Sequence, residues 1–347
     1  MISPRASGGA FRSVFHDIVS VSNLLAAWNE FKRGKRKKRD IALFELALEE
    51  NLFALHQELT GRTYAHAPYS GFYVCDPKRR HIHKASVRDR VLHQAMFRVL
   101  SPIFEKRFIY DSYSSRVHKG THAGVLRLAQ ALRKVSKNWR KPVFALKCDV
   151  RKFFDSIDHA VVRELIAHRV VDPQALQLID LILKSFEKLP AKGLPLGNVT
   201  SQLFANVYLN ELDQFMKHEL KARHYFRYCD DFVVVGDDRD LLERLILRIC
   251  HFLSLKLLLE LHPNKVEIRK LRQGVDFLGY VLLPHVRVIR TSTKKRMLRK
   301  LEEAQQALKI GSMTKERFQN AVQSYLGILS HCRNEKLGAK LRSFLER

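Results

Sequence analysis

Three aspartates stand where strand-prone apolar segments end, and their chemistry suits metal-assisted phosphoryl transfer. Asp230 and Asp231 are adjacent in Phe226-Arg-Tyr-Cys-Asp-Asp-Phe-Val-Val-Val235, which predicts a β-hairpin with two carboxylates at its tip. Asp149 closes a second apolar run that begins at Phe144. Because side-by-side carboxylates repel each other in a half-buried hairpin, a bound divalent cation would stabilise them, as in two-metal phosphoryl transfer. The simpler alternative gives these side chains only turn and capping roles.

The charge of the chain points to a polyanionic partner. Its 347 residues include 62 Lys and Arg against 35 Asp and Glu, a formal net charge of +27. Because this excess is spread along the chain, most of the surface is expected to attract phosphodiester backbones. A basic protein without nucleic-acid function, or one that binds membrane surfaces, is the weaker alternative. Hydrophobic residues make up 46% of the chain, enough for two or three subdomains with their own cores.

Cysteine usage and hydropathy favour a reducing compartment. The five cysteines contain no Cys-x-x-Cys pair, which argues against a structural zinc site and a disulfide framework. No apolar run reaches the roughly 18 residues of a membrane span, and the first residues lack a signal-peptide core. We therefore expect a cytoplasmic protein with no membrane partner.

The elements expected around the aspartates are helices and short strands. Helical patterns cover residues 14–60, 86–106, 121–137, 239–255, 293–310 and 315–330, and strand patterns cover 64–83, 143–150, 226–235, 257–268 and 275–283. A loop at 193–202 leads into an apolar helix, and Asp158 is expected to cap a helix rather than act in catalysis. The mixture of helix and strand patterns predicts an α+β fold. The sequence contains no internal repeat and no low-complexity linker.

Five segments in order resemble the catalytic motifs of reverse transcriptases. Asp149-Val-Arg-Lys-Phe-Phe154-Asp-Ser-Ile-Asp-His159 resembles the first motif, residues 193–210 resemble the substrate-binding loop and helix, and Tyr228-Cys-Asp-Asp231 is similar to the Tyr-x-Asp-Asp box. Lys265 and Phe277-Leu-Gly-Tyr280 match the two motifs that follow. The resemblance, over residues 60–330, implies a right-hand polymerase whose antiparallel palm sheet packs on helices. The expected regions are an N-terminal helical and basic extension at 1–50, fingers at 51–142, a palm at 143–283 and a helical thumb at 284–347.

The resemblance also implies a metal site and a set of substrates. Asp149 and Asp230 would bind two Mg²⁺ ions, for which Mn²⁺ can substitute, with the backbone carbonyl of Val150 as a further ligand. Asp231 is expected to matter less, because adjacent residues on a turn seldom both face one ion. One ion would activate the primer 3′-hydroxyl, and the other would neutralise the triphosphate. The substrates are a template RNA, a DNA or RNA primer, and dNTPs.

The resemblance makes seven residues candidates for contacts with the incoming nucleotide: Lys78, Arg80, Phe154, Leu196, Gly197, Gln202 and Lys265. Phe154 matches the steric gate that excludes a ribose 2′-hydroxyl, although an ordinary core aromatic is the alternative. Arg80 matches the fingers arginine that grips the triphosphate, and Lys78 is the second choice, because a guanidinium fork suits phosphate better than an ammonium does. Lys265 would lie near the leaving pyrophosphate or, equally, be a solvated strand lysine.

Two basic clusters are candidates for binding the nucleic-acid strands. The run at 32–39 is a solvated loop, a localisation signal or a clamp for an RNA backbone, and its candidate residues are Lys35, Arg36, Lys37 and Lys38. The helix expected at 293–310 has a basic face, with candidates Lys294, Lys295, Arg296 and Arg299.

The sequence of the substrate loop resembles that of one subgroup of reverse transcriptases. Most bacterial reverse transcriptases carry Gln-Gly-x-x-x-Ser-Pro there, whereas this chain has Leu196-Gly-Asn-Val-Thr-Ser-Gln202, which looks like the enzymes of diversity-generating retroelements. Those enzymes misincorporate at template adenines. An apolar Leu196 beside Gly197 and Gln202 would remove polar contacts near the templating pair and weaken discrimination by hydrogen bonding. The subgroup implies a basic oligomeric accessory protein, which this basic chain would contact through RNA or local acidic patches.

Some features and alternatives stay open. Ser112-Tyr-Ser, Lys119-Gly-Thr-His122 and Tyr325-Leu-Gly-Ile-Leu-Ser-His331 also resemble that subgroup, without an assigned role. The chain ends after the expected thumb helices, which would be unusual for a mobile-intron enzyme. The alternatives are a group II intron, retron or phage-defence reverse transcriptase of ordinary fidelity and, from another class, an RNA-binding scaffold without catalysis.

Overall fold

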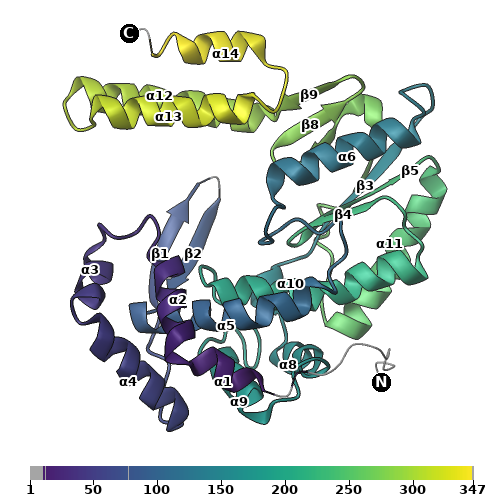
Figure 1. The fold of residues 1–347 in the computed structure, drawn as a ribbon. Coiled ribbons are helices and arrows are strands. Elements are labelled where there is room, and N and C mark those ends of the chain that lie inside the picture. Colours follow the sequence, from purple (N-terminus) through teal and green to yellow (C-terminus); the bar gives the residue numbers. More distant parts are fainter. Residues whose placement is uncertain (1–10, 12, 77, 346–347) are drawn as a thin grey trace. The chain divides into compact units, whose positions relative to one another are not determined.

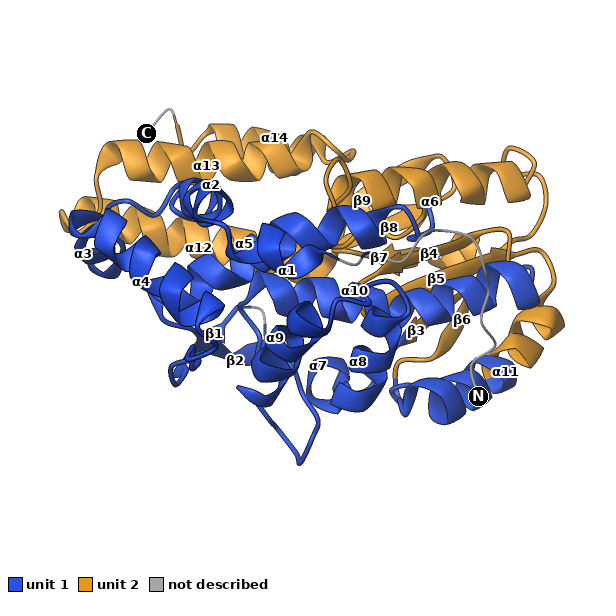
Figure 2. Cartoon of the chain, turned by 60° about the horizontal axis from the view of Figure 1, so that its bottom comes forward, with its two compact units in different colours: residues 1–110, 149–221, 247–264 blue, residues 111–148, 222–246, 265–347 orange. Residues whose placement is uncertain are grey.

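The chain folds into two compact units that are each built from separated segments. In a computed structural model (Figure 1), the described residues are 11, 13–76 and 78–345. One unit comprises residues 1–110, 149–221 and 247–264, and the other comprises 111–148, 222–246 and 265–347 (Figure 2). We call them unit 1 and unit 2. The four consecutive regions expected from the sequence remain a prediction.

Unit 1 begins with helices and one exposed hairpin. The helices are α1 (Val14–Val19), α2 (Val21–Phe31), α3 (Arg39–Leu46), α4 (Leu48–Thr60) and α5 (Val87–Glu105), and the hairpin pairs β1 (Ser70–Cys75) with β2 (Arg79–Lys84). Ser20 and Ser86 cap α2 and α5, since each hydroxyl accepts a backbone N–H of the first turn. The basic run at 32–38 lies between α2 and α3, and Lys78 lies in the turn between the two strands.

The rest of unit 1 is helical. It contains α7 (Phe153–Ser156), α8 (His159–Ala167), α9 (Pro173–Lys184), α10 (Val199–Gln214) and a π-helix at Phe215–Glu219. Asp158 is the N-cap of α8, as predicted, and accepts from the backbone N–H groups of Ala160 and Val161 at 3.0 and 3.3 Å. The expected apolar helix after the 193–202 loop is α10, which buries Leu203, Phe204, Val207, Tyr208 and Leu212.

Unit 2 contains a four-stranded sheet in the order β4-β5-β3-β6. Its strands are β3 (Phe144–Asp149), β4 (Tyr225–Tyr228), β5 (Asp231–Gly236) and β6 (Glu267–Lys270). The β4–β5 and β3–β6 pairs are antiparallel. Helix α6 (Thr121–Val135) buries Val125 and Leu128 against Phe226 and Val233 of this sheet. The long helix α11 (Arg239–Leu257) contributes residues to both units.

A smaller sheet and three helices complete unit 2. The sheet has the order β7 (Val275–Phe277), β8 (Tyr280–Leu283), β9 (Val286–Ile289), and the helices are α12 (Thr291–Lys309), α13 (Lys315–Leu329) and α14 (Glu335–Arg342), drawn in yellow in Figure 1. Leu278 and Gly279 both have positive φ (50° and 89°), which defines a tight two-residue hairpin between β7 and β8. Phe277, Met297 and Phe318 lie in the same core as the residues under α6.

Several element boundaries differ from the prediction. The strand expected at 257–268 was wrong: α11 continues to Leu257, Leu258 ends it with φ 50°, and only Glu267–Lys270 forms a strand. The single strand expected at 275–283 is instead a hairpin, because Leu278-Gly279 turns the chain. The prediction missed α9, β9 and α14. None of the helices among the described residues combines the length and apolarity needed to cross a membrane.

Candidate active site

The adjacent aspartates lie at the tip of the β4–β5 hairpin, as predicted. Tyr228 pairs with Asp231, so Cys229 and Asp230 form the two-residue turn, and Asp231 is the first residue of β5. Cys229 adopts a left-handed conformation with φ 55°. Burial, reinforced by the Asp230 carboxylate, raises the pKa of the Cys229 thiol to about 12, so the thiol is neutral at physiological pH.

A buried arginine fixes this turn from within unit 2. Arg227 is fully buried, and its guanidinium donates to the carbonyl oxygen of Cys229 at 3.2 Å. Its backbone joins the segment 111–113: Arg227 N–H donates to the Asp111 carbonyl, and Tyr113 N–H donates to the Arg227 carbonyl, each at 2.9 Å. The Ser112-Tyr-Ser segment therefore supports the β4–β5 hairpin that carries Asp230 and Asp231, which we call the acid hairpin. Sequence reasoning missed Arg227, whose signal is a charged residue inside an otherwise apolar strand.

The strand that ends at Asp149 lies beside the strand that begins at Asp231. β3 and β5 are neighbours in the sheet, and Lys147 of β3 places Nζ 3.7 Å from Asp231 Oδ2. The same ammonium lies 3.5 Å from Asp276 Oδ1, and Asp276 is also paired with Arg290. Side chains alternate along a strand, so Lys147 and Asp149 occupy the same face of β3. Sequence reasoning missed Lys147 and Asp276. For Lys147, the available signal was its spacing of two residues from Asp149.

The residues after β3 are held by backbone hydrogen bonds within unit 1. His262 N–H donates to the Asp149 carbonyl and Arg151 N–H donates to the Glu260 carbonyl, both at 2.8 Å. Between them Val150 is buried and bridges to Leu261. These bonds fix the backbone on both sides of Val150, directly after the Asp149 side chain. A metal ligand needs such a fixed main chain, because its carboxylate must keep one geometry.

The steric-gate candidate and the substrate loop are connected in unit 1. Phe154 is half-buried in α7, and its carbonyl accepts from Leu194 N–H at 2.8 Å. Two residues later, the Leu196 carbonyl accepts from His83 N–H of β2 at 2.9 Å. The same hairpin strand carries Arg80, which is exposed. The structure thus joins three of the predicted nucleotide contacts through one continuous backbone path.

The loop at Gly197 depends on a backbone conformation that disfavours side chains. Gly197 has φ 119°, and a Cβ there would lie 3.0 Å from Ile82 Cγ2 of β2. Asn198 Nδ2 donates to the His83 carbonyl at 3.4 Å, so two residues of the loop, Leu196 and Asn198, hold β2. Leu196 is half-buried, while Gly197 and Gln202 are exposed. The loop therefore presents its glycine and one amide side chain to solvent.

A buried polar network contacts the end of this loop through the first turn of α10. Thr200, in the first turn of α10, lies 2.7 Å from His93 Nδ1, and His93 Nε2 lies 3.2 Å from His66 Nε2. Asp89 is also buried and accepts from the Tyr64 hydroxyl at 2.8 Å. Burial, assisted by His66, lowers the pKa of His93 to about 3, so this imidazole is neutral under physiological conditions. Sequence reasoning missed this network, whose members are scattered over more than one hundred positions.

The remaining predicted residues occupy other elements. Lys78 is exposed in the β1–β2 turn, and Lys265 is half-buried in the segment before β6. In the basic run, Arg36, Lys37 and Lys38 are exposed, whereas Lys35 Nζ donates to the Phe31 carbonyl at 2.8 Å. On α12, the exposed candidates are Lys294, Lys295 and Arg299, and Arg296 is half-buried. Their exposure suits strand binding, although their roles remain predictions.

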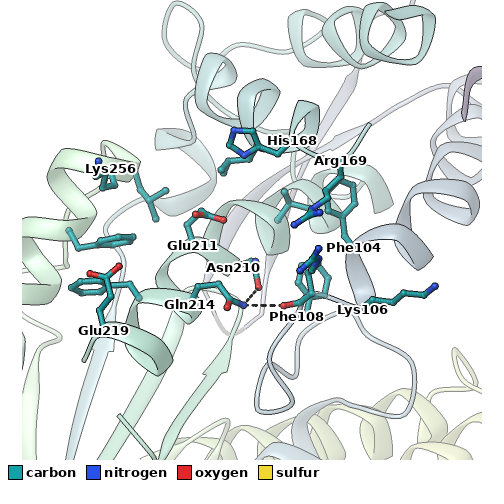
Figure 3. A pocket seen from close by; sticks show the side chains of 16 residues that line it. Phe104, Lys106, Phe108, His168, Arg169, Asn210, Glu211, Gln214, Glu219 and Lys256 are labelled. Atoms are coloured by element: carbon teal, nitrogen blue, oxygen red, sulfur yellow. Dashed lines mark hydrogen bonds between the residues drawn. The ribbon is translucent and has the colours of Figure 1, made fainter. Parts of the chain in front are cut away.

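One cavity of unit 1 involves none of the residues predicted from the sequence. It has a volume of about 650 Å³ and is lined by Phe104, His168, Arg169, Glu211 and Gln214, among others (Figure 3). Gln214 Nε2 donates to the Arg107 carbonyl at 3.1 Å, which fixes one wall. This cavity therefore does not coincide with the predicted site of chemistry.

The carboxylates provide the donor chemistry for a divalent metal, without a closed cluster. Among the described residues, no three His, Cys, Asp or Glu side chains are arranged to hold a metal ion. Aspartate and backbone carbonyl oxygens are the hard ligands that Mg²⁺ prefers, and such sites keep several waters and substrate phosphates as further ligands. The donor set fits the predicted ion, and the assignment remains a proposal.

Comparison with known proteins identifies the family. Residues 76–282 match the family described as reverse transcriptase (RNA-dependent DNA polymerase). Protein YkfC of Escherichia coli K12 is 24% identical over 281 residues, covering 70% of this chain and 73% of that protein. The group II intron-encoded protein LtrA of Lactococcus lactis is 24% identical over 320 residues, covering 72% of this chain and 51% of LtrA. Nuclear intron maturase 1 of Arabidopsis thaliana is 26% identical over 202 residues, covering 42% of this chain and 27% of the maturase.

These relatives confirm the predicted kinship with group II intron proteins. The chain spans about half the length of LtrA. The matched residues run from the β1–β2 turn through β3 and the acid hairpin to β8. Because this match covers more than half of the chain, the protein belongs to the reverse transcriptase family and is an RNA-directed DNA polymerase.

Proposed function

We propose that Asp149 and Asp230 are the principal metal-binding carboxylates of this polymerase. The supporting observations are the position of Asp230 at the hairpin tip and the adjacency of β3, which ends at Asp149, to β5. Asp231 ranks second, because its carboxylate already faces the Lys147 ammonium. When bound, Mg²⁺ or Mn²⁺ would activate the primer hydroxyl and neutralise the leaving pyrophosphate. The Val150 carbonyl completes the proposed ligands.

The incoming dNTP is proposed to bind between the β2 strand and the substrate loop of unit 1. Arg80, with Lys78 as the alternative, would bind the triphosphate through its guanidinium fork. Phe154 would exclude the ribose 2′-hydroxyl, and Gln202 would contact the nucleotide from the first turn of α10. Support comes from the hydrogen bond between His83 and Leu196, which ties β2 to the loop. Lys265 is proposed to lie near the pyrophosphate.

The polymerase is proposed to be the error-prone enzyme of a diversity-generating retroelement. One observation carries this: the segment Leu196-Gly197 presents a half-buried leucine and an exposed glycine where other bacterial enzymes have an amide. A leucine side chain offers no hydrogen bond, so a mispaired base loses less there than at a polar site. The proposed setting is the cytoplasm, with a template RNA, a DNA or RNA primer and a basic oligomeric accessory protein as partners.

Primer extension on four RNA templates tests this function. Each template places A, C, G or U at the first copied position, and all four dNTPs are supplied with Mg²⁺. Asp230→Ala provides the blank. Frequent misincorporation confined to template A is the expected result. Uniformly low error with full synthesis would contradict the error-prone function and leave the polymerase assignment intact.

The runner-up is a group II-like reverse transcriptase of ordinary fidelity. Kinship with LtrA, a group II intron-encoded protein, favours it. Low error at all four template bases would select it. The RNA-binding scaffold without catalysis is not retained, because the chain belongs to a family of RNA-directed DNA polymerases. Unchanged DNA synthesis by Asp149→Ala would remove Asp149 from the catalytic assignment.

A further inference from the structure

Three buried polar side chains of unit 1 are hydrogen-bonded in series and end at the substrate loop. Thr200 Oγ1 lies 2.7 Å from His93 Nδ1, and His93 Nε2 lies 3.2 Å from His66 Nε2. His66 Nδ1 in turn lies 2.6 Å from the Ala67 carbonyl oxygen. Thr200 and His93 are each 1% exposed, and the His66 side chain is 2% exposed. We call Thr200, His93 and His66 the histidine network. None of the three is among the proposed nucleotide contacts.

The carbonyl at its far end gives the histidine network one direction. A carbonyl oxygen only accepts hydrogen bonds, so a neutral His66 ring carries its hydrogen on Nδ1 and accepts at Nε2. Burial, assisted by His66, lowers the pKa of His93 to about 3, so this ring is neutral and donates from Nε2. His93 Nδ1 then accepts, and the Thr200 hydroxyl is the donor. Each hydrogen bond therefore depends on the orientation of the next ring.

Aromatic contacts continue from the histidine network to the other end of the substrate loop. His66 stacks on Tyr69 with ring centroids 4.6 Å apart. Phe186 packs edge-on against Tyr69 and His83, with centroid distances of 5.8 and 4.5 Å. His83 N–H donates to the Leu196 carbonyl at 2.9 Å. The contacts that leave the loop through the first turn of α10 therefore return to it at Leu196.

Both ends of the β1–β2 hairpin belong to this series of contacts. Tyr69 directly precedes β1, and His83 is the last residue but one of β2. The same hairpin carries Arg80, and the first turn of α10 leads to Gln202. The hairpin and the helix start therefore cannot shift independently without breaking one of these contacts.

We propose that the histidine network positions the substrate loop for the incoming dNTP, with Thr200, His93 and His66 as positioning residues. Because these side chains are buried, they act through the first turn of α10 and through the β1–β2 hairpin. A series of directed hydrogen bonds fixes orientation, whereas apolar packing alone would let the elements slide. The inference rests on the proposed dNTP site only in naming that site as what the network holds in place.

Steady-state primer extension with varied dNTP tests the hydroxyl at the start of the network. Thr200→Val removes the donor and leaves His93 Nδ1 buried without its hydrogen bond. We expect the KM for dNTP to rise about tenfold, with a smaller change in kcat. Thr200→Ser keeps the hydroxyl and should restore a KM close to that of the wild type.

Tyr208→Phe is the matched control on the same helix. It removes a buried hydroxyl that lies about two turns further along α10 and donates to the Leu257 carbonyl at 2.6 Å. Its loss should lower stability and leave the KM for dNTP unchanged. Equal KM values for Thr200→Val and Tyr208→Phe would overturn the proposal.

A substitution at the far end separates a connected network from independent packing. His66→Phe keeps a ring to stack on Tyr69 and removes the acceptor for His93, so it should raise the KM for dNTP. His66→Gln, whose amide oxygen can replace Nε2 as acceptor, should come closer to the wild type. Combining His66→Phe with Thr200→Val should raise KM no further than one of them alone, because both act through His93. Multiplied effects would overturn the network. If Thr200→Val fails to fold, the contrast between the two His66 variants carries the test.

Nitrogen-15 NMR of labelled histidine tests the direction of the hydrogen bonds without substrate. At pH 8, His66 is expected as the Nδ1–H tautomer and His93 as the Nε2–H tautomer. Replacing each histidine with glutamine assigns its signals. The opposite tautomers would overturn the proposed direction.

Arg80→Gln distinguishes failure of the network from failure of the dNTP site. This variant should raise the KM for dNTP if the triphosphate binds beside β2. A raised KM in Arg80→Gln with a wild-type KM in Thr200→Val would retain the site and overturn the network. An unchanged KM in Arg80→Gln would instead remove the proposed triphosphate contact, whatever Thr200→Val shows.

Discussion

Lys147 Nζ lies 3.7 Å from Asp231 Oδ2, so an internal cation already faces the second aspartate of the hairpin. The same ammonium lies 3.5 Å from Asp276, and all three side chains are less than a quarter exposed. The cation thus offsets repulsion among acids on one side of the sheet. It also competes for a carboxylate oxygen that a divalent metal would use.

We therefore expect Lys147→Met to lower the stability of the metal-free protein and to increase its stabilisation by metal. Without the ammonium, Asp231 and Asp276 lose a shared partner, and we expect unfolding to become easier by about 1–3 kcal/mol in EDTA. Mg²⁺ or Mn²⁺ should then raise the melting temperature of the variant more than that of the wild type. Thermal melts with and without metal measure both effects. Arg151→Met, which removes a more exposed pair with Glu260, is the control and should change either quantity little. Equal metal responses of wild type and Lys147→Met would contradict the competition.

His93 gives a second prediction, on the pH dependence of stability. Its folded pKa of about 3 lies below the ordinary value of 6.5, so the unfolded chain binds an additional proton between these values. Stability from the neutral imidazole is present above pH 6.5 and is lost as the pH falls toward 3. His93→Gln, which can still hydrogen-bond to Thr200, should flatten the decline by up to about 1.4 kcal/mol per pH unit. Urea unfolding between pH 7 and 4.5 measures it. Parallel curves for the two proteins would show that His93 does not carry the effect.

Gly197 tests the contact between the substrate loop and β2. An alanine there would combine φ 119° with a 3.0 Å approach to Ile82, so the loop must shift. Gly120 is the matched control, because it has φ 113° with open space around its added Cβ. Both alanine variants should lose about 1–2 kcal/mol of stability to backbone strain. Only Gly197→Ala should also raise KM for dNTP, measured by steady-state primer extension. Equal KM values would separate Gly197 from nucleotide binding.

The sequence predicted best where chemistry and pattern were local. The acid hairpin followed from two β-prone runs around Asp230, and the Asp158 cap followed from its position before an apolar helix. Order and spacing of the motifs then supported the family, which the comparison confirmed. Short-range rules suffice for such features, because turn and cap geometry depends on a few neighbouring residues.

The structural features that were not predicted from the sequence depend on contacts between distant segments. Lys147 and Asp276 are 3.5 Å apart although β3 and β7 are far apart in the chain, and no periodicity marks that pair. Arg227 and Asp111 are likewise joined by a backbone hydrogen bond between segments that are distant in the chain. The strand expected at 257–268 failed for a related reason. Its apolar leucines serve both the end of α11 and the segment after it, and tertiary burial decided between them.

Leu196 carries the last prediction, because its side chain distinguishes the two candidate functions. Leu196→Gln restores an amide while leaving intact the backbone bond between the Leu196 carbonyl and His83 N–H. If the apolar side chain weakens discrimination, the variant should misincorporate about tenfold less at template A, since one hydrogen bond at the pair is worth roughly 1 kcal/mol or more. Error at template C, G and U should change little.

Leu196→Met, of similar volume and without an amide, is the matched control and should keep the wild-type error pattern. Error rates come from sequencing extension products of one defined RNA. If Leu196→Gln and Leu196→Met give the same rate at template A, the polarity of residue 196 does not set fidelity, and the exposed Gln202 becomes the next residue to replace.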